Sequence, residues 1–161
     1  MTNDSSKAVA DRATTIKKTF SRETSISVEI NADPFIIWSL LTNGARHPEW
    51  NSSIISIEGR IAEGETIRLV SRLDPKRKYK LTVKECVPEK RLVWGDAMGN
   101  RIYSLQKNEN DRILFSMTEK IGGPLFPLFA RMIPPFDKSF EQFASDLKKN
   151  AETIMKKNLN P

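Results

Sequence analysis

The stretch PLFPLFARMIPPFDKSFEQFASDLKKNAETIM, residues 124–155, decides the fold. Its apolar residues recur at intervals of three and four positions, which is the spacing of one face of an α-helix. These apolar residues are Phe126, Phe129, Ile133, Phe136, Phe140, Phe143, Leu147, Ala151 and Ile154. A fully buried phenylalanine contributes about 1.5–3 kcal/mol to folding. The sequence therefore predicts a long amphipathic C-terminal helix whose apolar face is covered by the rest of the chain.

Glycine and proline interrupt the residues that lead into this helix. Gly122-Gly123-Pro124 separates the helix from the upstream chain, and Pro127 and Pro134-Pro135 break the helical spacing. Proline is tolerated at the start of a helix but not in its interior, which predicts a short helical piece over 125–132 and then the long helix. A phenylalanine-rich segment beside a Gly-Gly pair is either a gate over a pocket or a rigid corner.

Upstream of this segment, apolar and polar residues alternate, which indicates antiparallel strands with one wet face. Strands are predicted over 24–30, 55–59, 65–73, 79–87, 91–95, 101–105 and 112–120, with turns at Asp74-Pro75, Pro88-Glu89, Gly99-Asn100 and 108–111. Asp33 and Pro34 suit the N-cap and first position of a helix that ends at Asn43-Gly44, and 45–50 suits a second helical turn. The predicted fold class is α+β: one curved antiparallel sheet of about seven strands, two short helices after the first strand, and the long C-terminal helix.

Composition limits the architecture and the chemistry. The chain has 161 residues, which suits one domain, predicted over 20–157 and preceded by a polar, mobile arm over 1–19. No run of residues is long and apolar enough to span a membrane, and no apolar signal core is visible. A single cysteine fits a reducing compartment, so we expect a cytoplasmic protein. One histidine and one cysteine cannot build a Cys/His metal cluster, and no metal or cofactor is expected.

Several segments of the sequence are similar to a known superfamily. They are 30–34 (INADP), 37–43 (IWSLLTN), 47–51 (HPEWN), 57–65 (IEGRIAEGE), 91–95 (RLVWG) and 119–125 (EKIGGPL). In these segments the chain resembles the START-like, polyketide cyclase/dehydratase and lipid-transport superfamily (SRPBCC). The resemblance implies the helix-grip fold, also found in the birch-pollen allergen, with a hydrophobic cavity between the concave sheet and the long helix. A curved sheet cannot touch a straight helix along its whole length, which independently favours such a cavity.

Residues on the faces expected to point inward are the candidates for contact with a ligand. Among the tryptophans, Trp50 is the strongest candidate, since it follows a proline in a loop that the superfamily uses near its pocket mouth. The predicted ligand-binding residues are Trp38, Leu41, Trp50, Leu69, Ser71, Leu81, Val83, Glu85, Trp94, Arg101, Tyr103, Phe115, Met117, Phe129, Phe136 and Phe140.

Polar residues on these inward faces carry the most information, because burying them costs free energy unless they find partners. Glu85 and Glu119 lie in line with apolar neighbours on their strands, whereas the register around Arg101 and Tyr103 is open. If Arg101 faces Glu85 or Glu119, the two side chains form an internal ion pair or bind a ligand carboxylate or hydroxyl. Alternatively, these residues sit at strand ends in water. The same four residues are the weak candidates for catalysis, and His47 is interpreted as a loop residue.

Three functions remain open from the sequence. The first is binding, transport or sequestration of a small hydrophobic or amphipathic molecule such as a lipid. The second is acid/base catalysis of the polyketide cyclase, aromatase or dehydratase type. The third is a partner- or membrane-docking module with a collapsed cavity. The net charge of +6 and the cluster of Lys76, Arg77 and Lys78 suggest weak contact with an anionic membrane. The basic run 68–84 alternates with apolar residues, as the wet face of a sheet does, so nucleic acid is not expected as a partner.

Overall fold

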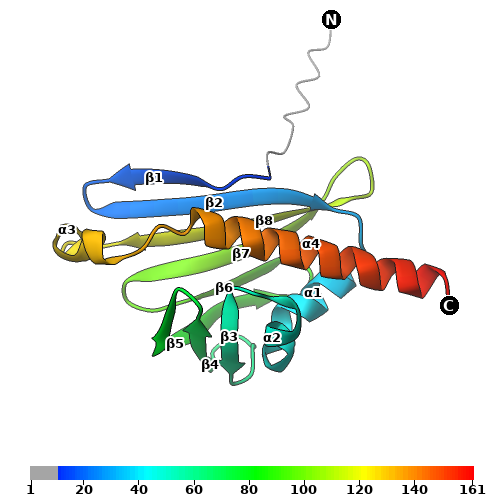
Figure 1. Cartoon of the computed structure of the whole chain (residues 1–161), viewed down its shortest axis with the longest axis horizontal. Helices are drawn as coiled ribbons and strands as arrows, with labels where there is room; N and C mark the ends of the chain where they lie inside the picture. Colours follow the sequence, from blue (N-terminus) through cyan, green and yellow to red (C-terminus); the bar gives the residue numbers. More distant parts are fainter. Residues whose placement is uncertain (1–10) are drawn as a thin grey trace, which may run out of the picture.

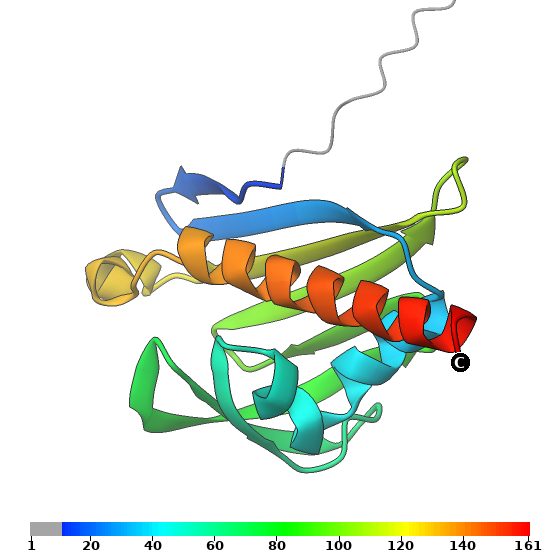
Figure 2. The same cartoon turned by 45° about the vertical axis from the view of Figure 1, so that its right-hand side comes forward.

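The computed structural model describes residues 11–161 and has an α+β fold with one eight-stranded antiparallel sheet. The strand order is β1-β2-β8-β7-β6-β5-β4-β3, and the long helix α4 runs across the concave face (Figures 1 and 2). The elements in chain order are β1 (Thr14–Lys18), β2 (Ser21–Ile30), α1 (Pro34–Thr42), η1 (Gly44–Arg46), α2 (His47–Trp50), β3 (Ile54–Glu58), β4 (Thr66–Ser71), β5 (Asp74–Val87), β6 (Arg91–Gly95), β7 (Gly99–Lys107), β8 (Ile113–Gly122), α3 (Phe126–Phe129), η2 (Ala130–Met132) and α4 (Asp137–Leu159). The predicted fold class is confirmed.

Part of the N-terminal segment that was expected to be a mobile arm, over 1–19, forms a strand. Residues 14–18 form β1 at the edge of the sheet and pair with β2 from Thr14↔Ser25 to Lys18↔Ser21. The hydroxyl of Thr15 also donates a hydrogen bond to Asp137 Oδ1 of α4 at 2.9 Å. Because most of β1 is exposed at the sheet edge, its sequence lacks the alternation that marked the other strands. Residues 1–10 of the expected arm lie outside the described residues.

Two predicted turns are also corrected. The β4–β5 turn is Arg72-Leu73, and Asp74 already belongs to β5, where it pairs with Ser71. Gly99 opens β7 rather than ending a turn, because Asp96 Oδ1 accepts hydrogen bonds from the backbone N–H groups of Met98 and Gly99 and folds the turn earlier. Both shifts lengthen the strands at the same end of the sheet.

The start of α1 forms as the sequence predicted. Asp33 is the N-cap, and its Oδ1 accepts a hydrogen bond from the backbone N–H of Phe35 at 2.9 Å. Pro34 occupies the first turn, where its missing N–H costs nothing. Within the described residues, no helix is long and apolar enough to cross a membrane.

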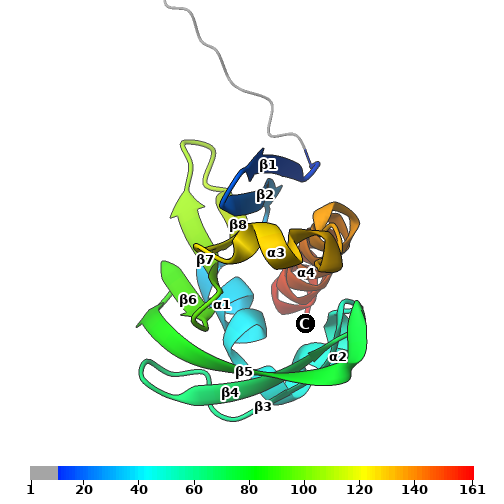
Figure 3. The ribbon, with the colours of Figure 1, turned by 90° about the vertical axis from the view of Figure 1, so that its left-hand side faces the viewer.

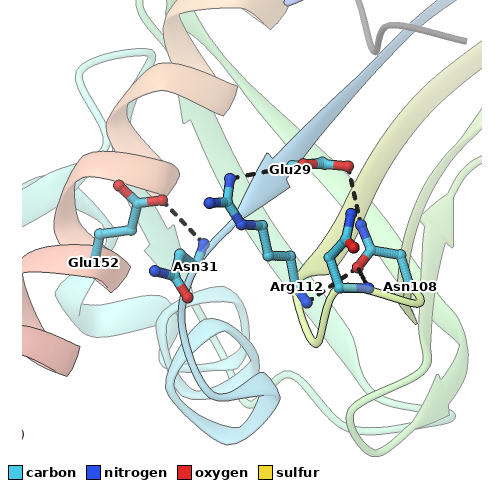
Figure 4. A network of polar contacts seen from close by, with 6 residues as sticks. Glu29, Asn31, Asn108, Arg112 and Glu152 are labelled. Atoms are coloured by element: carbon cyan, nitrogen blue, oxygen red, sulfur yellow. Dashed lines mark hydrogen bonds and ion pairs between the residues drawn. The ribbon is translucent and has the colours of Figure 1, made fainter. Parts of the chain in front are cut away.

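The C-terminal half of α4 packs closely against β2 and is tied to it by polar contacts. The backbone N–H of Asn31, just after β2, donates to Glu152 Oε1 of α4 at 2.9 Å. Nearby, Glu29 Oε1 accepts from Asn108 Nδ2 at 2.9 Å, and Glu29 Oε2 lies 3.9 Å from Arg112 Nη1 (Figure 4). We call this region the sealed end of the molecule.

Candidate functional site

A cavity of about 650 Å³ lies at the opposite end, between the sheet and the first turns of α4. Strands β4 to β8 supply one wall, and the segment 129–134 and the N-terminal part of α4 supply the other. Figure 3 looks onto this end, with α3 in front of α4 and β5 crossing below. We call it the open end, and we call the opening of the cavity there the mouth.

Aromatic rings form the helix side of the cavity. Phe136, just before α4, and Phe140, on its first turn, stack with ring centroids 6.1 Å apart. One turn further, Phe143 lines the inner end of the cavity and stacks on Tyr103 at 5.6 Å. Phe115 stacks behind these rings at 6.2 Å from Phe143. The core is thus closely packed at Phe143, whereas the cavity lies beside Phe136 and Phe140.

An ion pair lies in the cavity wall. Arg101 of β7 and Glu119 of β8 are directly opposite in register, and Arg101 Nε donates to Glu119 Oε2 at 2.6 Å. Their side chains are only 19% and 17% exposed. Burial lowers the pKa of Arg101, but the Glu119 carboxylate outweighs this effect and raises the pKa overall, so the guanidinium stays charged. The guanidinium carbon also lies 5.1 Å from the centroid of the Phe140 ring.

The Arg101–Glu119 pair is one of the alternatives that the sequence left open. The structure settles the register: Arg101 lines the cavity and Tyr103 points into the core. A guanidinium has five N–H donors, and only Nε is used by Glu119 in this pair, so Arg101 retains donors for a carboxylate or carbonyl of a ligand. Burial raises the pKa of the Tyr103 phenol to about 12, although the nearby Arg101 opposes the shift. At neutral pH Tyr103 is therefore protonated and cannot act as a base.

A second arginine fastens the segment that covers the cavity. Arg22 of β2 donates from Nη1 to the carbonyl of Ile133 at 3.2 Å and from Nη2 to that of Pro134 at 2.8 Å. Its guanidinium carbon lies 4.7 Å from the centroid of the Phe136 ring. Arg22 is itself buried, so these hydrogen bonds are shielded from water and tie the segment to the sheet.

The mouth contains polar residues that the sequence analysis missed. Tyr79 donates to Asp74 Oδ2 at 3.2 Å, and the guanidinium carbon of Arg77 lies 4.5 Å from the centroid of the Tyr79 ring. Burial, and then the Asp74 carboxylate, raise the pKa of the Tyr79 phenol. All three line the cavity. Asp74 and Arg77 were missed because Asp74-Pro75 was interpreted as a turn and the strand was predicted to begin only at Tyr79, whereas β5 begins at Asp74 and extends past the mouth.

Nine of the sequence-predicted ligand-binding residues line the cavity. They are Leu69, Ser71, Leu81, Trp94, Arg101, Met117, Phe129, Phe136 and Phe140. Seven others do not, and six of these pack in or against the core: Trp38, Leu41, Trp50, Val83, Tyr103 and Phe115. These six lie where helix and sheet are in contact, so no space remains beside them. Trp50 packs on Phe143 with ring centroids 5.5 Å apart.

The seventh, Glu85, corrects an expectation about the face of β5. Lys84 is an extra residue in the pairing with β6, because Val83 pairs with Trp94 and Glu85 with the next residue, Val93. A bulge of this kind reverses the alternation of side chains beyond it. Glu85 therefore points outward and accepts a hydrogen bond from Arg91 Nε at 2.9 Å. For the same reason Cys86 packs against the core, and burial raises the pKa of its thiol.

His47 is a core residue rather than a loop residue. It opens α2, is 1% exposed, and donates from Nε2 to the carbonyl of Leu41 at 2.9 Å. Its Nδ1 accepts from Asn51 Nδ2 at 3.2 Å, so the neutral ring satisfies both nitrogens. Burial lowers its pKa to about 4. His47 does not line the cavity, and its role is structural.

The described residues offer no group of three or more His, Cys, Asp or Glu side chains that could hold a metal ion. Of the four weak catalytic candidates, only Arg101 and Glu119 line the cavity. They are bound to each other, which positions them to hold a polar group.

No protein-family model and no curated protein sequence matches the chain. Solved structures do match. A protein of unknown function, EF2215 from Enterococcus faecalis, has a TM-score of 0.65 at 17% identity, covering 91% of this chain and 80% of that one. A START superfamily protein from Mycobacterium smegmatis has a TM-score of 0.59 at 17% identity, covering 82% and 98%. DynU16, from the dynemicin biosynthetic locus, has a TM-score of 0.61 at 14% identity, covering 83% and 48%.

The chain thus has the START-like helix-grip fold, with an internal cavity at one end of the grip. The resemblance seen in the sequence is confirmed at the level of the fold. At these identities the likeness extends no further than the fold.

Proposed function

We propose that this protein binds a small hydrophobic or amphipathic molecule, such as a lipid, in the cavity at the open end. The observation that carries the proposal is a largely apolar cavity of about 650 Å³ with one shielded ion pair, Arg101–Glu119, in its wall. The single cysteine supports a cytoplasmic setting.

The size and lining of the cavity support this proposal. Ligand pockets typically measure about 300–1,000 Å³ and combine apolar walls with a few placed polar groups. Phe136, Phe140, Leu69 and Met117 supply such walls here. An apolar ligand would gain free energy by leaving water, at about 25 cal/mol for each Å² of surface buried. The open space favours ligand binding over a docking module with a collapsed cavity.

The ion pair supports an amphipathic ligand. Two charges removed from water gain little stability from each other unless further hydrogen bonds satisfy their remaining donors and acceptors. Arg101 and Glu119 are largely removed from water yet still face the cavity. We propose that a carboxylate, carbonyl or hydroxyl of the ligand completes their hydrogen bonding, while the apolar part lies along Phe136 and Phe140.

Titration with 8-anilinonaphthalene-1-sulfonate, an apolar anion that fluoresces in dry sites, tests the proposal. Ser139→Phe would fill the cavity, because Ser139 lines it from α4. Ser145→Phe is the matched control on the same helix, since Ser145 is exposed on the outer face. We expect the wild type and Ser145→Phe to bind the probe and Ser139→Phe to lose binding. Equal binding by all three proteins would contradict the proposal, and native mass spectrometry would independently show a co-purified ligand.

Catalysis of the polyketide cyclase type is a second candidate, favoured by the position of Glu119 in the cavity wall and by the likeness to DynU16. In this alternative Glu119 is the acid/base group and Arg101 binds a ketone oxygen. A poly-β-ketone thioester would be converted to a cyclised product by the wild type and not by Glu119→Gln. A substrate that binds and is released unchanged would contradict catalysis and leave ligand binding intact.

A further inference from the structure

Six of the eleven exposed large hydrophobic side chains of the described residues gather at the open end. Two backbone hydrogen bonds hold their turns together: Gly122 N–H donates to the carbonyl of Met98, and Gly123 N–H to that of Phe20, both at 3.0 Å. Leu73 and Met132 lie at the mouth itself, in the cavity lining. We call these six residues the mouth patch: Phe20, Leu73, Met98, Leu125, Leu128 and Met132.

The segment between β8 and α4 is apolar on two sides. Phe126 is buried and packs edge-on against Phe129, which lines the cavity. Leu125, Leu128 and Met132 follow one another at intervals of three and four residues, as on one face of a helical turn. They face solvent, and Leu128 and Met132 are 79% and 81% exposed. The inner side thus closes the cavity, while nothing in the described chain covers the outer side.

Positive charge surrounds this apolar patch. Lys17 and Lys18 precede the turn of Phe20, Arg72 adjoins Leu73, and Arg131 lies between Leu128 and Met132. All four are exposed, and none forms a salt bridge with another described residue.

Nearby carboxylates only partly offset this charge. Asp74, Asp96 and Asp137 hydrogen-bond neutral groups and keep their negative charge, whereas Glu23 and Lys120 offset each other. With Lys76 and Arg77 of β5 added to the four cations above, six exposed cationic side chains outnumber these three carboxylates. The open end is therefore both apolar and net positive.

We infer that the mouth patch docks the protein on an anionic lipid bilayer, with the mouth of the cavity facing the membrane. Exposed leucine, methionine and phenylalanine side chains enter the interface between head groups and acyl chains, and lysine and arginine contact the acidic head groups. Exposed apolar side chains gathered at one end of a molecule usually mark an interaction site. The exposed basic residues beside the patch, Lys17, Lys18, Arg72 and Arg131, favour an anionic surface as its partner.

The docked orientation gives the cavity a direct route to its ligand. Since Leu73, Met98 and Met132 belong both to the patch and to the cavity lining, a lipid could pass from the bilayer into the cavity without crossing water. This step rests on the proposed function, whereas docking itself does not. The membrane contact inferred here differs from the one expected from the sequence, which used Lys76, Arg77 and Lys78. Lys78 pairs with Glu58 at 3.0 Å, and Arg77 packs on the ring of Tyr79.

Co-sedimentation with vesicles tests the inference. The probes are vesicles of phosphatidylcholine alone and of phosphatidylcholine with phosphatidylglycerol in equal amounts. We expect the wild type to sediment with the mixed vesicles, weakly with the neutral ones, and less as salt is raised. The double variant Leu125→Glu/Leu128→Glu, at two patch residues outside the cavity lining, should lower the partition coefficient by about tenfold or more, because two apolar contacts are lost and two repulsive charges gained. Arg131→Glu should lower it by a smaller factor.

Phe35→Glu is the matched control, since Phe35 is 65% exposed on α1, away from the patch. No sedimentation of the wild type with mixed vesicles would overturn the inference, and so would an equal loss in Phe35→Glu and the double variant. If the double variant instead abolished a dimer seen by light scattering and vesicles were not bound, the patch would be an interface between two copies. Fluorescence of 8-anilinonaphthalene-1-sulfonate, measured without vesicles, distinguishes a failure of docking from a failure of the proposed ligand binding. The double variant should still bind this probe.

Discussion

The two ends of α4 show the same helical period but meet different surroundings. At the sealed end, Leu147 and Ala151 are fully buried, and Glu152 fastens the helix to the end of β2. At the open end, the larger side chains of Phe136 and Phe140 border a cavity and an internal ion pair. A short side chain such as Ala151 allows close packing, whereas aromatic side chains hold helix and sheet apart. The difference indicates that the sealed end supplies stability, whereas the open end leaves the space in which we propose that a ligand binds.

The largest expected effect is that of a charge placed beneath the helix. Phe140→Asp should lower the free energy of unfolding by more than about 4 kcal/mol, or prevent folding, because it removes a buried ring and adds a buried carboxylate. Phe136→Asp, at a half-buried position that borders the mouth, should cost clearly less. Urea unfolding followed by circular dichroism measures both. A Phe140→Asp protein as stable as the wild type would mean that α4 does not pack as described.

The second largest loss of stability is expected when the Arg101–Glu119 ion pair is broken. Arg101→Met should destabilise the protein by up to about 4 kcal/mol, because it leaves Glu119 shielded and unpaired. The double variant Arg101→Met/Glu119→Met should recover much of this loss. At the sealed end, Glu29→Gln should cost less than about 1 kcal/mol, since its pair with Arg112 is wide and partly exposed. If Arg101→Met and Glu29→Gln lowered the free energy of unfolding equally, the proposed difference between the two ends would be contradicted.

A buried histidine away from the cavity should make stability depend on pH. The pKa of His47 is lowered to about 4 in the folded protein, from an ordinary value of 6.5. Between these values only the unfolded chain binds the proton, so stability is lost as pH falls from 6.5 towards 4 and is retained above 6.5. The loss amounts to about 3 kcal/mol.

Urea unfolding at several pH values, compared between the wild type and His47→Gln, isolates the contribution of His47 from that of carboxylates that titrate in the same range. The variant should be less stable at neutral pH but should show a shallower decline in acid. Parallel declines in both proteins would show that His47 titrates alike in the folded and unfolded states.

The smallest effect is expected from the basic cluster of β5. Replacing Lys76, Arg77 and Lys78 together by Ala should change stability by less than about 1 kcal/mol, because exposed charges contribute little. Thermal unfolding measures this. A large fall in melting temperature would mean that the packing of Arg77 on Tyr79 supports the mouth.

The sequence was sufficient for the fold and for part of the site. Regular alternation on β8 placed Glu119 in line with inward-facing apolar residues, and the helical period of the phenylalanines placed Phe136 and Phe140. Alternation on β7 left the register of Arg101 open. Alternation failed where the backbone is irregular. The bulge at Lys84 turns Glu85 outward, and no residue near Lys84 indicates a bulge in the sequence.

The remaining errors come from tertiary packing. Trp50 and Tyr103 are as apolar and as inward-facing as the residues that line the cavity, but helix and sheet are in contact there. Where the two elements separate depends on the curvature of the whole sheet, which no local pattern encodes. The mouth residues Asp74 and Arg77 were missed because Pro75 signals a turn but here lies within an extended strand.

The stability of Ser139→Phe, measured by urea unfolding beside Ser145→Phe, tests most directly whether the open end is hollow. Serine and phenylalanine have similar helix propensities, so the control accounts for the backbone. If the cavity exists, the added ring fills it, and Ser139→Phe is at least as stable as Ser145→Phe. If side chains already fill this space, the ring is overpacked and Ser139→Phe loses about 1–3 kcal/mol relative to the control, which would contradict the account.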